Sequence, residues 1–165
     1  MGFFDKEERP HKVVGKSIFA SPSFYIMMIL LVLFLKFVVT PTRALETSME
    51  PTIRSGSTVL VYKLQQTYSR GDVIMFEYNG KLMIKRIIGE PNQTVQYKGG
   101  YINVNGSNIK DSFTRSGQDY GLLNREVQLG PNEYIVLGDN RANSYDSKNF
   151  GPITRDMIKG KVLFK

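Results

Sequence analysis

The sequence contains no cysteine, and its single histidine, His11, lies in the N-terminal segment. Without cysteine the chain can form no disulfide bond, offer no thiol nucleophile and bind no metal through thiolate ligands. Because no histidine follows residue 11, the rest of the chain cannot build a Ser-His-Asp triad or the usual zinc sites. We therefore predict no metal and no cofactor, and any hydrolytic chemistry must use another base.

The charge is moderately positive, with 22 Lys and Arg against 15 Asp and Glu and a formal net charge of +7. Charges of both signs are interspersed, and no basic run is dense enough to follow a nucleic-acid backbone. We therefore predict no nucleic-acid partner. The excess positive charge is better explained by a mild attraction to an anionic lipid membrane.

One long apolar run lies near the N-terminus, where residues 24–39 are apolar except for Lys36. Counted from Ile18, the run reaches about 20 residues, the length that spans the hydrocarbon core of a bilayer. We predict an uncleaved transmembrane anchor over residues 18–40. A cleaved signal peptide is the alternative, but Thr40-Pro41-Thr42-Arg43 is a poor cleavage junction.

The positive charges near this run predict its orientation. Lys and Arg are more frequent before the run than at or after its end: Lys6, Arg9, Lys12 and Lys16 precede it, whereas Lys36 and Arg43 lie at or beyond its end. By the positive-inside rule, residues 1–17 form a cytoplasmic segment and residues 41–165 an extracytoplasmic domain. The predicted location is the cell membrane, with a single span.

Beyond the anchor, short apolar and β-branched runs alternate with turn residues. The runs cover residues 57–62, 72–78, 81–88, 94–97, 101–104 and 133–137. Asn79-Gly80 and Asn105-Gly106 are strong signals for tight turns between strands. The pattern predicts a mostly β domain with little helix, arranged as a sandwich or a barrel. We also predict an exposed loop over residues 107–125, and a C-terminal helical turn followed by a last strand over residues 161–164.

A serine and a lysine are candidates for chemistry. Ser48 belongs to a Ser-x-x-Pro sequence that ends at Pro51, and such a sequence alone is more typical of a turn before a strand. In the strand predicted over residues 81–88, alternate side chains share a face, so Lys85 and Arg86 lie on opposite faces among apolar neighbours. Burying a cation is costly unless its charge is paired or discharged.

Lysine and arginine differ in how they can meet that cost. Burial lowers the pKa of a lysine, and a neutral Lys85 would be a competent general base. Arg86 keeps its proton and therefore needs a carboxylate partner. The alternative is an edge strand on which both cations are solvated and only their stems pack on apolar neighbours.

A third segment, residues 137–152, concentrates acids, bases, hydroxyls and amides between an apolar strand and a Gly-Pro turn. It is either a polar surface loop or a scaffold whose side-chain hydrogen bonds hold a site.

Taken together, the three segments resemble the type I signal peptidases, in the compact form found in Gram-positive bacteria. The matching blocks, in family order, are Ser48-Met49-x-Pro51-Thr52, Gly71-Asp72-Val73, Lys85-Arg86-Ile87-Ile88-Gly89, and Gly138-Asp139-Asn140-Arg141 with Ser144, Asp146-Ser147 and Phe150-Gly151.

The resemblance implies a signal-peptidase-like β domain and a role for each matching residue. Ser48 would be the nucleophile, Lys85 the general base, and Ser144 the serine that orients the lysine. The implied supporting ion pairs involve Asp139, Asp146, Arg86 and Arg141, and the implied substrate-binding residues are Met49, Pro51, Met83 and Ile84. The implied substrates are signal peptides of exported proteins, with small residues one and three positions before the cut, bound by strand addition.

The chain also departs from the family pattern. Glu46 occupies a position where some members offer a hydroxyl to the oxyanion, and an ionised carboxylate cannot donate a hydrogen bond there. Lys148 replaces an arginine and gives up bidentate geometry. Pro91-Asn92-Gln93 stands where Pro-Gly-Asp is common. These departures suggest an altered substrate range or a weak enzyme.

Two alternatives remain open at this point. The first is a signal-peptidase-like assembly factor or chaperone in sortase-dependent pilus polymerisation, with pilin or sortase as partner and little or no peptidase activity. The second is a LexA-like autoprotease, which shares the Ser-Lys dyad. The anchor and the absence of a DNA-binding front domain argue against the second.

Overall fold

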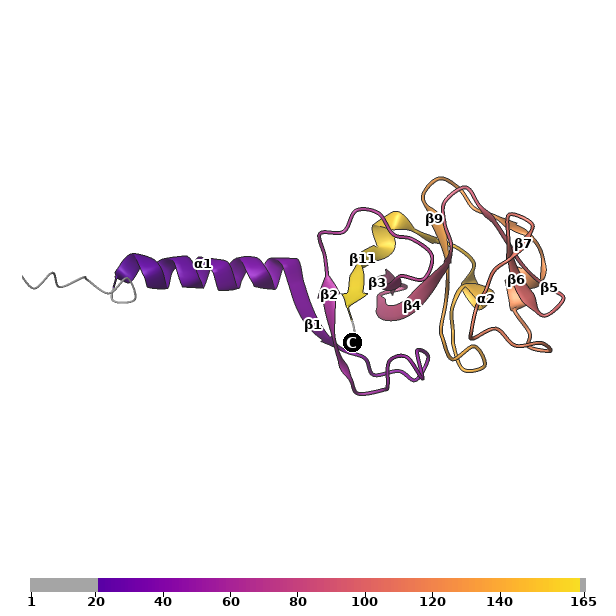
Figure 1. Cartoon of the computed structure of the whole chain (residues 1–165), viewed down its shortest axis with the longest axis horizontal. Coiled ribbons are helices and arrows are strands. Elements are labelled where there is room, and N and C mark those ends of the chain that lie inside the picture. The colour runs from indigo at the N-terminus through magenta and orange to yellow at the C-terminus, as the bar shows by residue number, and fades with distance from the viewer. Residues whose placement is uncertain (1–20, 164–165) are drawn as a thin grey trace, which may run out of the picture. The chain divides into compact units, whose positions relative to one another are not determined.

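The computed structural model describes residues 21–163 of the chain (Figure 1). The predicted cytoplasmic segment 1–17, residues 18–20 of the predicted anchor and Phe164 of the predicted last strand lie outside these residues. The chain divides into two compact units after Leu35.

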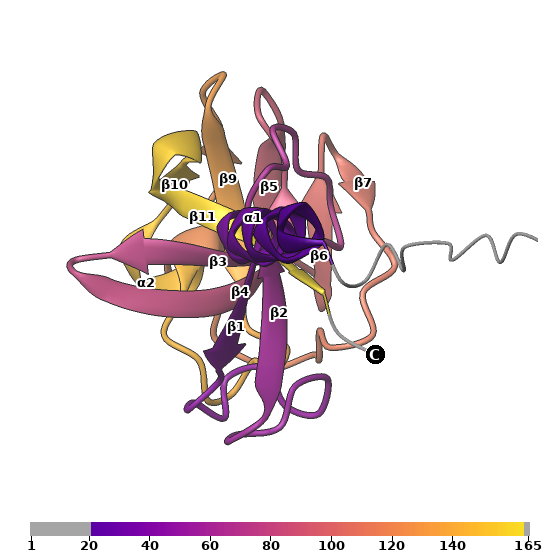
Figure 2. The ribbon, with the colours of Figure 1, turned by 90° about the vertical axis from the view of Figure 1, so that its left-hand side faces the viewer.

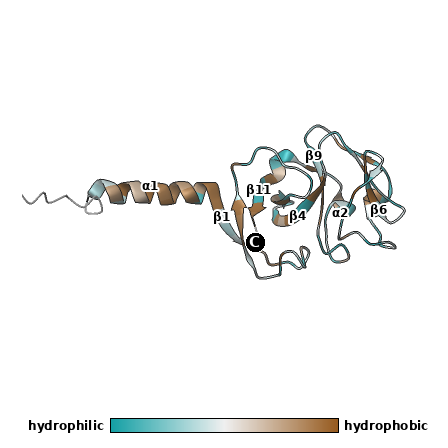
Figure 3. Cartoon of the chain, viewed as in Figure 1, coloured by the Kyte–Doolittle hydropathy of each residue, from teal (hydrophilic) through white to brown (hydrophobic). Residues whose placement is uncertain are grey.

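The first helix, α1, covers Pro22–Val38, and none of its described side chains is buried. Pro22 is tolerated at its start, because the first backbone N–H groups of a helix have no partner within the helix. Figure 3 shows that apolar residues occupy most of the helix. Within residues 21–163, no helix combines the length and the apolar character needed to cross a membrane. The helix ends at Val38, and a strand takes Val39 and Thr40, which the sequence analysis assigned to the anchor.

The rest of the described chain forms two antiparallel sheets with little helix, which confirms the prediction of a mostly β domain. The larger sheet has the order β1-β2-β11-β3-β4-β9-β10 and the smaller one the order β7-β6-β5-β8. The strands of the larger sheet are β1 (Val39–Arg43), β2 (Thr58–Tyr62), β3 (Val73–Tyr78), β4 (Lys81–Gly89), β9 (Glu133–Leu137), β10 (Ile153–Thr154) and β11 (Ile158–Leu163). Those of the smaller sheet are β5 (Thr94–Lys98), β6 (Tyr101–Val104), β7 (Ser107–Asn108) and β8 (Val127–Gln128). The short helices are η2 (Gly121–Asn124), α2 (Ser147–Phe150) and η3 (Arg155–Met157).

Both predicted Asn-Gly turns are present. Asn79 and Gly80 join β3 to β4 with φ values of 49° and 75°, and Asn105 and Gly106 join β6 to β7 with values of 50° and 76°. Positive φ at both central residues is what the type I′ hairpin turn requires. Figure 2 shows β3 and β4 as a hairpin, in which Lys85 lies opposite Ile74. The hairpin register therefore sets which face of β4 each cation occupies.

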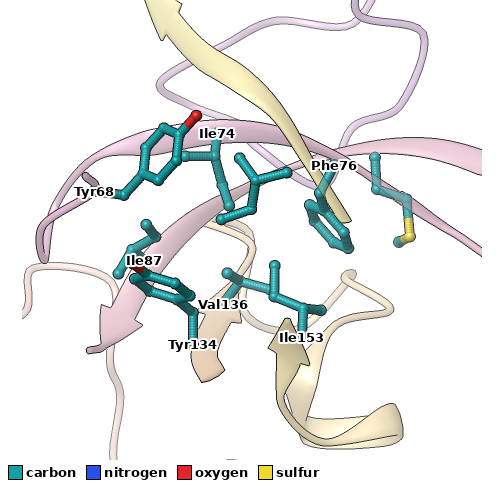
Figure 4. Packing of buried hydrophobic residues seen from close by; sticks show 9 residues of the cluster. Tyr68, Ile74, Phe76, Ile87, Tyr134, Val136 and Ile153 are labelled. Atoms are coloured by element: carbon teal, nitrogen blue, oxygen red, sulfur yellow. The ribbon is translucent and has the colours of Figure 1, made fainter. Parts of the chain in front are cut away.

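The larger sheet has an apolar cluster on one face. Figure 4 shows its members Tyr68, Ile74, Phe76, Ile87, Tyr134, Val136 and Ile153 converging from β3, β4, β9, β10 and the segment before β3. A second cluster packs Val59, Val61 and Met75 with Met49 and Ile53. Because Met49 follows Ser48 directly and Ile53 lies five positions after it, burial of these two side chains anchors the turn that carries the serine.

The exposed loop predicted over residues 107–125 is only partly correct. The segment includes β7 and η2, and it buries Tyr120 and Leu123 completely. Tyr120 stacks on Tyr97 of β5, with ring centroids 4.0 Å apart. The apolar residues of the segment 107–125 are too few and too irregularly spaced to show a strand or helix period. This packing could therefore not be predicted from the sequence.

Four strands were not predicted, namely β1, β7, β8 and β10. Three of them are only two residues long. The first two residues of β1 were assigned to the anchor, and its Pro41 is tolerated because β1 lies at the edge of its sheet. The predicted helical turn and last strand near the C-terminus correspond to η3 and β11.

Candidate active site

The side chains of Ser48 and Lys85 meet in a buried contact. Lys85 Nζ donates a hydrogen bond to Ser48 Oγ at 2.6 Å. Ser48 lies in the turn between β1 and β2, and Lys85 lies in β4, an interior strand of the larger sheet. Lys85 is 0 % exposed and Ser48 is 6 % exposed. The alternative in which both cations are solvated on an edge strand is therefore wrong.

Burial determines the protonation of Lys85. It lowers the pKa of the Lys85 amine, because the ammonium form loses its hydration. The charges of Glu46 and Asp146 oppose this effect, and the charge of Lys148 adds to it. The only carboxylate oxygen within ion-pair distance, among the described residues, is Glu46 Oε2 at 3.6 Å from Nζ. A hydroxyl beside such an amine can lose its proton to it, which is the requirement for an activated serine.

Gly138 allows the loop after β9 to approach the serine. The backbone N–H of Asn140 donates to the Ser48 carbonyl oxygen at 3.0 Å. A Cβ atom on residue 138 would lie 2.5 Å from that carbonyl oxygen and 2.2 Å from Ser144 Oγ. Since real Cβ atoms do not approach that closely, only glycine permits this contact.

Arg86, on the opposite face of β4, has a carboxylate partner. Its Nε and Nη2 atoms donate to the two oxygens of Asp139 at 2.8 and 2.6 Å. Asp139 also accepts from Thr52 Oγ1 at 2.5 Å. The hydrogen bonds with Asp139 raise the pKa of Arg86 above its usual value. This bidentate pair links β4 to the loop after β9 and to the Ser48 turn.

Arg141 pairs with a residue that the sequence analysis did not identify. Its Nη1 atom donates to Asp111 and, at 2.6 Å, to Thr114 Oγ1, and its Nε atom donates to the Gly138 carbonyl oxygen at 2.9 Å. Burial by itself raises the pKa of Asp111, but the bonds and charge of Arg141 lower it overall. Asp111 and Thr114 lie in the segment 107–125, whose sequence has no recognisable motif.

Phe113 adds an aromatic contact to both arginines. The guanidinium carbons of Arg86 and Arg141 lie 5.4 and 5.8 Å from the centre of its ring. Cations at such distances are attracted to the negative face of an aromatic ring. The segment 107–125 thus contacts Arg141 through a carboxylate and a hydroxyl, and it places one aromatic ring near both arginines.

Asp146 does not form the ion pair expected for it with an arginine. Its side chain accepts from the backbone N–H groups of Lys148 and Gly138, both at 3.0 Å, and forms a capping box with Asn149 at the start of α2. A carboxylate just before a helical turn satisfies backbone donors that would otherwise have no partner. Through these hydrogen bonds Asp146 holds the backbone at Gly138 and Lys148 in place near Lys85.

Ser144 and Lys148 also differ from expectation. Ser144 Oγ is buried and has no hydrogen-bond partner in the described part of the chain, so the expected bond to Lys85 is not formed. Lys148 is 9 % exposed, and its Nζ atom donates to the Arg141 carbonyl oxygen at 2.5 Å. A lysine thus supports the backbone here, where the resemblance implied an arginine and a carboxylate.

Two cavities border the serine and Glu46. The first, of about 380 Å³, includes Ser48 in its wall and is otherwise lined largely by the apolar residues Leu45, Met49, Ile53, Met75, Leu82 and Ile84. The second, of about 450 Å³, is lined by Met83, Tyr78 and Tyr145, among others. Glu46 lines both. Of the predicted substrate-binding residues, Met49, Ile84 and Met83 therefore face these cavities.

Pro51 lies elsewhere. It lines a third cavity, of about 560 Å³, together with Phe113 and Arg141. Within residues 21–163, no cluster of His, Asp or Glu is suited to hold a metal ion. The structure thus places the hydroxyl of Ser48 against a buried amine, next to a largely apolar cavity.

Comparisons with known proteins show the family to which the chain belongs. The family model described as signal peptidase, peptidase S26, matches residues 17–165. Signal peptidase IB of Staphylococcus aureus is 35% identical over 164 residues, covering 87% of this chain and 85% of that protein. Signal peptidase I V of Bacillus subtilis is 34% identical over 131 residues, covering 70% of this chain and 78% of that protein. Signal peptidase I of Leptolyngbya laminosa is 35% identical over 136 residues, covering 72% of this chain but only 64% of that longer protein.

A solved structure is similar as well. The crystal structure of a signal peptidase I from Enterococcus faecalis matches with a TM-score of 0.50 and 26% identity, covering 58% of this chain and 97% of that one. The family match extends over nearly the whole chain and includes both Ser48 and Lys85. The chain belongs to the signal peptidase family, peptidase S26.

Proposed function

We propose that this protein is a serine endopeptidase that removes signal peptides from exported proteins, with Ser48 as nucleophile and Lys85 as general base. The observation that carries the proposal is the 2.6 Å contact between Lys85 Nζ and Ser48 Oγ, made by an amine with no exposure to water. Membership of the signal peptidase family supports the class of substrate.

The reaction follows from the chemistry of an amine and a hydroxyl in contact. Neutral Lys85 takes the proton of Ser48 as Oγ attacks the scissile carbonyl carbon. The tetrahedral intermediate collapses, the C–N bond breaks, and Lys85 passes its proton to the leaving amine. Lys85 then takes a proton from water as the water oxygen attacks the ester carbonyl carbon, and it returns that proton to Ser48 Oγ as the C–O bond breaks. The backbone N–H of Ser48 supplies one hydrogen bond to the oxyanion.

The free edge of β4 is suited to hold the substrate in an extended form. Residues 81–85 of β4 pair with β3 on one side, whereas β9 pairs only with Arg86, Ile87 and Gly89. Part of this stretch lines the same cavity as Ser48. An extended peptide that adds to this edge satisfies the free backbone groups, and the apolar cavity accepts its small side chains.

The location follows from the N-terminal run. The apolar run that ends at Val38 anchors the chain in the cell membrane, and residues 1–17 remain in the cytoplasm. The strands from Val39 onward act on the extracytoplasmic side, with the lipid membrane as a partner. The exposed apolar side chains of α1 and the excess of Lys and Arg before it support this topology.

The test is cleavage of a signal-peptide substrate with small residues at the two specificity positions. We expect Ser48→Ala and Lys85→Ala each to lower kcat by about a thousandfold or more, because each removes a member of the catalytic unit. Lys159→Ala is the matched control, since Lys159 pairs with Glu77 at the surface. A folded Ser48→Ala or Lys85→Ala variant with activity near that of the wild type would contradict the dyad.

The assembly role considered from sequence finds no support in the relatives described above, which are all named signal peptidases. The departures at Glu46 and Lys148 leave the contact between Ser48 and Lys85 in place.

A further inference from the structure

Glu46 completes a triangle with the two residues of the proposed dyad. Its Oε2 atom lies 3.3 Å from Ser48 Oγ and 3.6 Å from Lys85 Nζ, and the third side is the 2.6 Å contact between serine and lysine. A carboxylate, a hydroxyl and an amine are therefore all within reach of one another. The roles proposed above use only the last two.

The direction of the hydrogen bonds in this triangle is opposite to that needed for catalysis. A serine hydroxyl has one proton to donate. While Lys85 is an ammonium it can only donate to Ser48 Oγ, so the serine proton goes to Glu46, whose carboxylate can only accept. General base catalysis requires the hydroxyl to donate to the lone pair of Lys85. With Glu46 in place, the serine proton points away from its base.

Glu46 is placed so that it can leave. Its side chain is 63 % exposed, and it lies in the irregular segment between β1 and the Ser48 turn. It lines both cavities that flank the site, one of which also contains Ser48. A peptide that extends through both cavities must pass over its carboxylate.

We infer that Glu46 is a positioning residue that holds the resting dyad in the reversed order of hydrogen bonds and is displaced when a substrate peptide binds. This inference rests on the proposed Ser48–Lys85 dyad. In the free enzyme Glu46 stabilises the ammonium form of Lys85 and takes the serine proton as a hydrogen bond. When the peptide moves the carboxylate into water, Lys85 loses its counter-ion, transfers its proton to solvent water and accepts the hydrogen bond of Ser48.

The charges around Lys85 support this sequence of events. Three charged groups act on its amine, namely Glu46 from the loop, Asp146 at the start of α2 and Lys148 within α2. Asp146 is held by backbone N–H groups and cannot leave without losing them. Lys85 is already fully buried, so a bound peptide can remove little more of its hydration. Departure of Glu46 is therefore the main way in which substrate binding lowers the pKa of Lys85.

The test compares two pH profiles of the full-length enzyme. The acidic limb of kcat/KM reports the free enzyme, and that of kcat reports the enzyme–substrate complex. For the wild type we expect the kcat limb to lie about one pH unit below the kcat/KM limb, the scale on which a neighbouring opposite charge shifts a pKa. In Glu46→Gln the kcat/KM limb should move down to meet the kcat limb, which itself should not move. Glu46→Asp, which keeps the charge, should restore a separation.

Glu50→Gln is the matched control. Glu50 is the same residue type four positions along the chain. Among the described residues its carboxylate accepts only from Ser55 N, at 3.4 Å, and Glu50→Gln should give the wild-type profiles. Coincident limbs in the wild type, equal shifts of both limbs in Glu46→Gln, or no shift at all would each overturn the inference. If Ser48→Ala and Lys85→Ala are inactive in the same assay, such a result overturns the role of Glu46 alone; if either is active, the proposed dyad itself fails.

Discussion

Strand β4 carries two adjacent cations, Lys85 on one face and Arg86 on the other, and the two faces provide them with different surroundings. Arg86 is 17 % exposed and is bound by both oxygens of Asp139. Lys85 is fully buried, and its only carboxylate neighbour within ion-pair distance, in the part of the chain that the structure describes, is the largely exposed Glu46. The charge of Arg86 is therefore firmly paired, whereas Lys85 has no firm partner and can lose its proton more readily.

The difference teaches how one strand can serve both structure and chemistry. Arginine cannot lose its proton in a protein, so a buried arginine must be paired, and pairing makes it a structural link. Lysine can become neutral, so a lysine without a firm partner can be buried and used as a base. Exchanging the two residue types would remove both functions.

Among the effects on stability, we expect the largest when the ion pair between Arg86 and Asp139 is broken. In Arg86→Met, the buried carboxylate of Asp139 keeps only the hydroxyl of Thr52. We expect the free energy of unfolding to fall by about 3 kcal/mol, as is typical when one partner of a buried pair is removed. Urea unfolding measures this, and Arg54→Met, at an exposed position, is the control. A loss no greater than that of the control would mean that the pair is not structural.

A smaller loss is expected at the loop that positions Ser48 against Lys85. In Gly138→Ala the new methyl group would overlap the Ser48 carbonyl oxygen and Ser144. We expect overpacking to cost about 2 kcal/mol of unfolding free energy and cleavage activity to fall, because the serine moves relative to the lysine. Gly117→Ala tests a glycine with open space around its Cβ position, although its positive φ makes that substitution strained as well. Unchanged kcat in a folded Gly138→Ala variant would show that this contact does not position the site.

Substitution of Lys85, on the other face of β4, should change the stability in the opposite direction. Lys85→Met replaces a desolvated amine with an apolar side chain of similar length, and Ser48 keeps Glu46 as an acceptor. We expect this variant to be inactive but more stable than the wild type by about 1 kcal/mol, because replacing buried charge by apolar groups is often stabilising. Thermal and urea unfolding of Lys85→Met and Arg86→Met, measured side by side, give the comparison its sharpest form. Equal destabilisation of the two variants would remove the distinction between the faces.

The smallest effect is a dependence of stability on pH. The pKa of Lys85 is lowered from 10.5 in the folded state, so between the lowered pKa and 10.5 the unfolded chain binds a proton that the folded chain does not. The free energy of unfolding should therefore rise with pH across this window. Lys85→Met should lack this rise, and the difference between the two unfolding curves from neutral pH to pH 10.5 measures it. A difference that is flat with pH would mean that the amine keeps its ordinary pKa.

Much of the fold could be predicted from local patterns. The longer strands follow from runs of β-branched and apolar residues, and the β3–β4 hairpin follows from Asn79-Gly80, whose turn geometry is nearly determined by its residues. The two-residue strands β7, β8 and β10 are too short to show a strand pattern, and β8 and β10 form only by pairing with β5 and β9.

The site was predictable to a lesser degree. Periodicity alone placed Lys85 and Arg86 on opposite faces, but only the resemblance brought Ser48 to Lys85, since the two are far apart in sequence. Asp111 had no motif to mark it. Asp146 was expected in an ion pair, but its position before α2 gives it backbone donors instead. Such choices between competing partners depend on the three-dimensional arrangement, which local sequence does not specify.

The central claim is that burial lowers the pKa of Lys85, so that its amine can serve as a base. The most direct measurement is the titration of its side chain by NMR in the full-length protein, with ¹³C-labelled lysine and with Lys85→Met to identify the signal. The account predicts a midpoint well below the ordinary lysine value of 10.5. A midpoint at or above that value would contradict it.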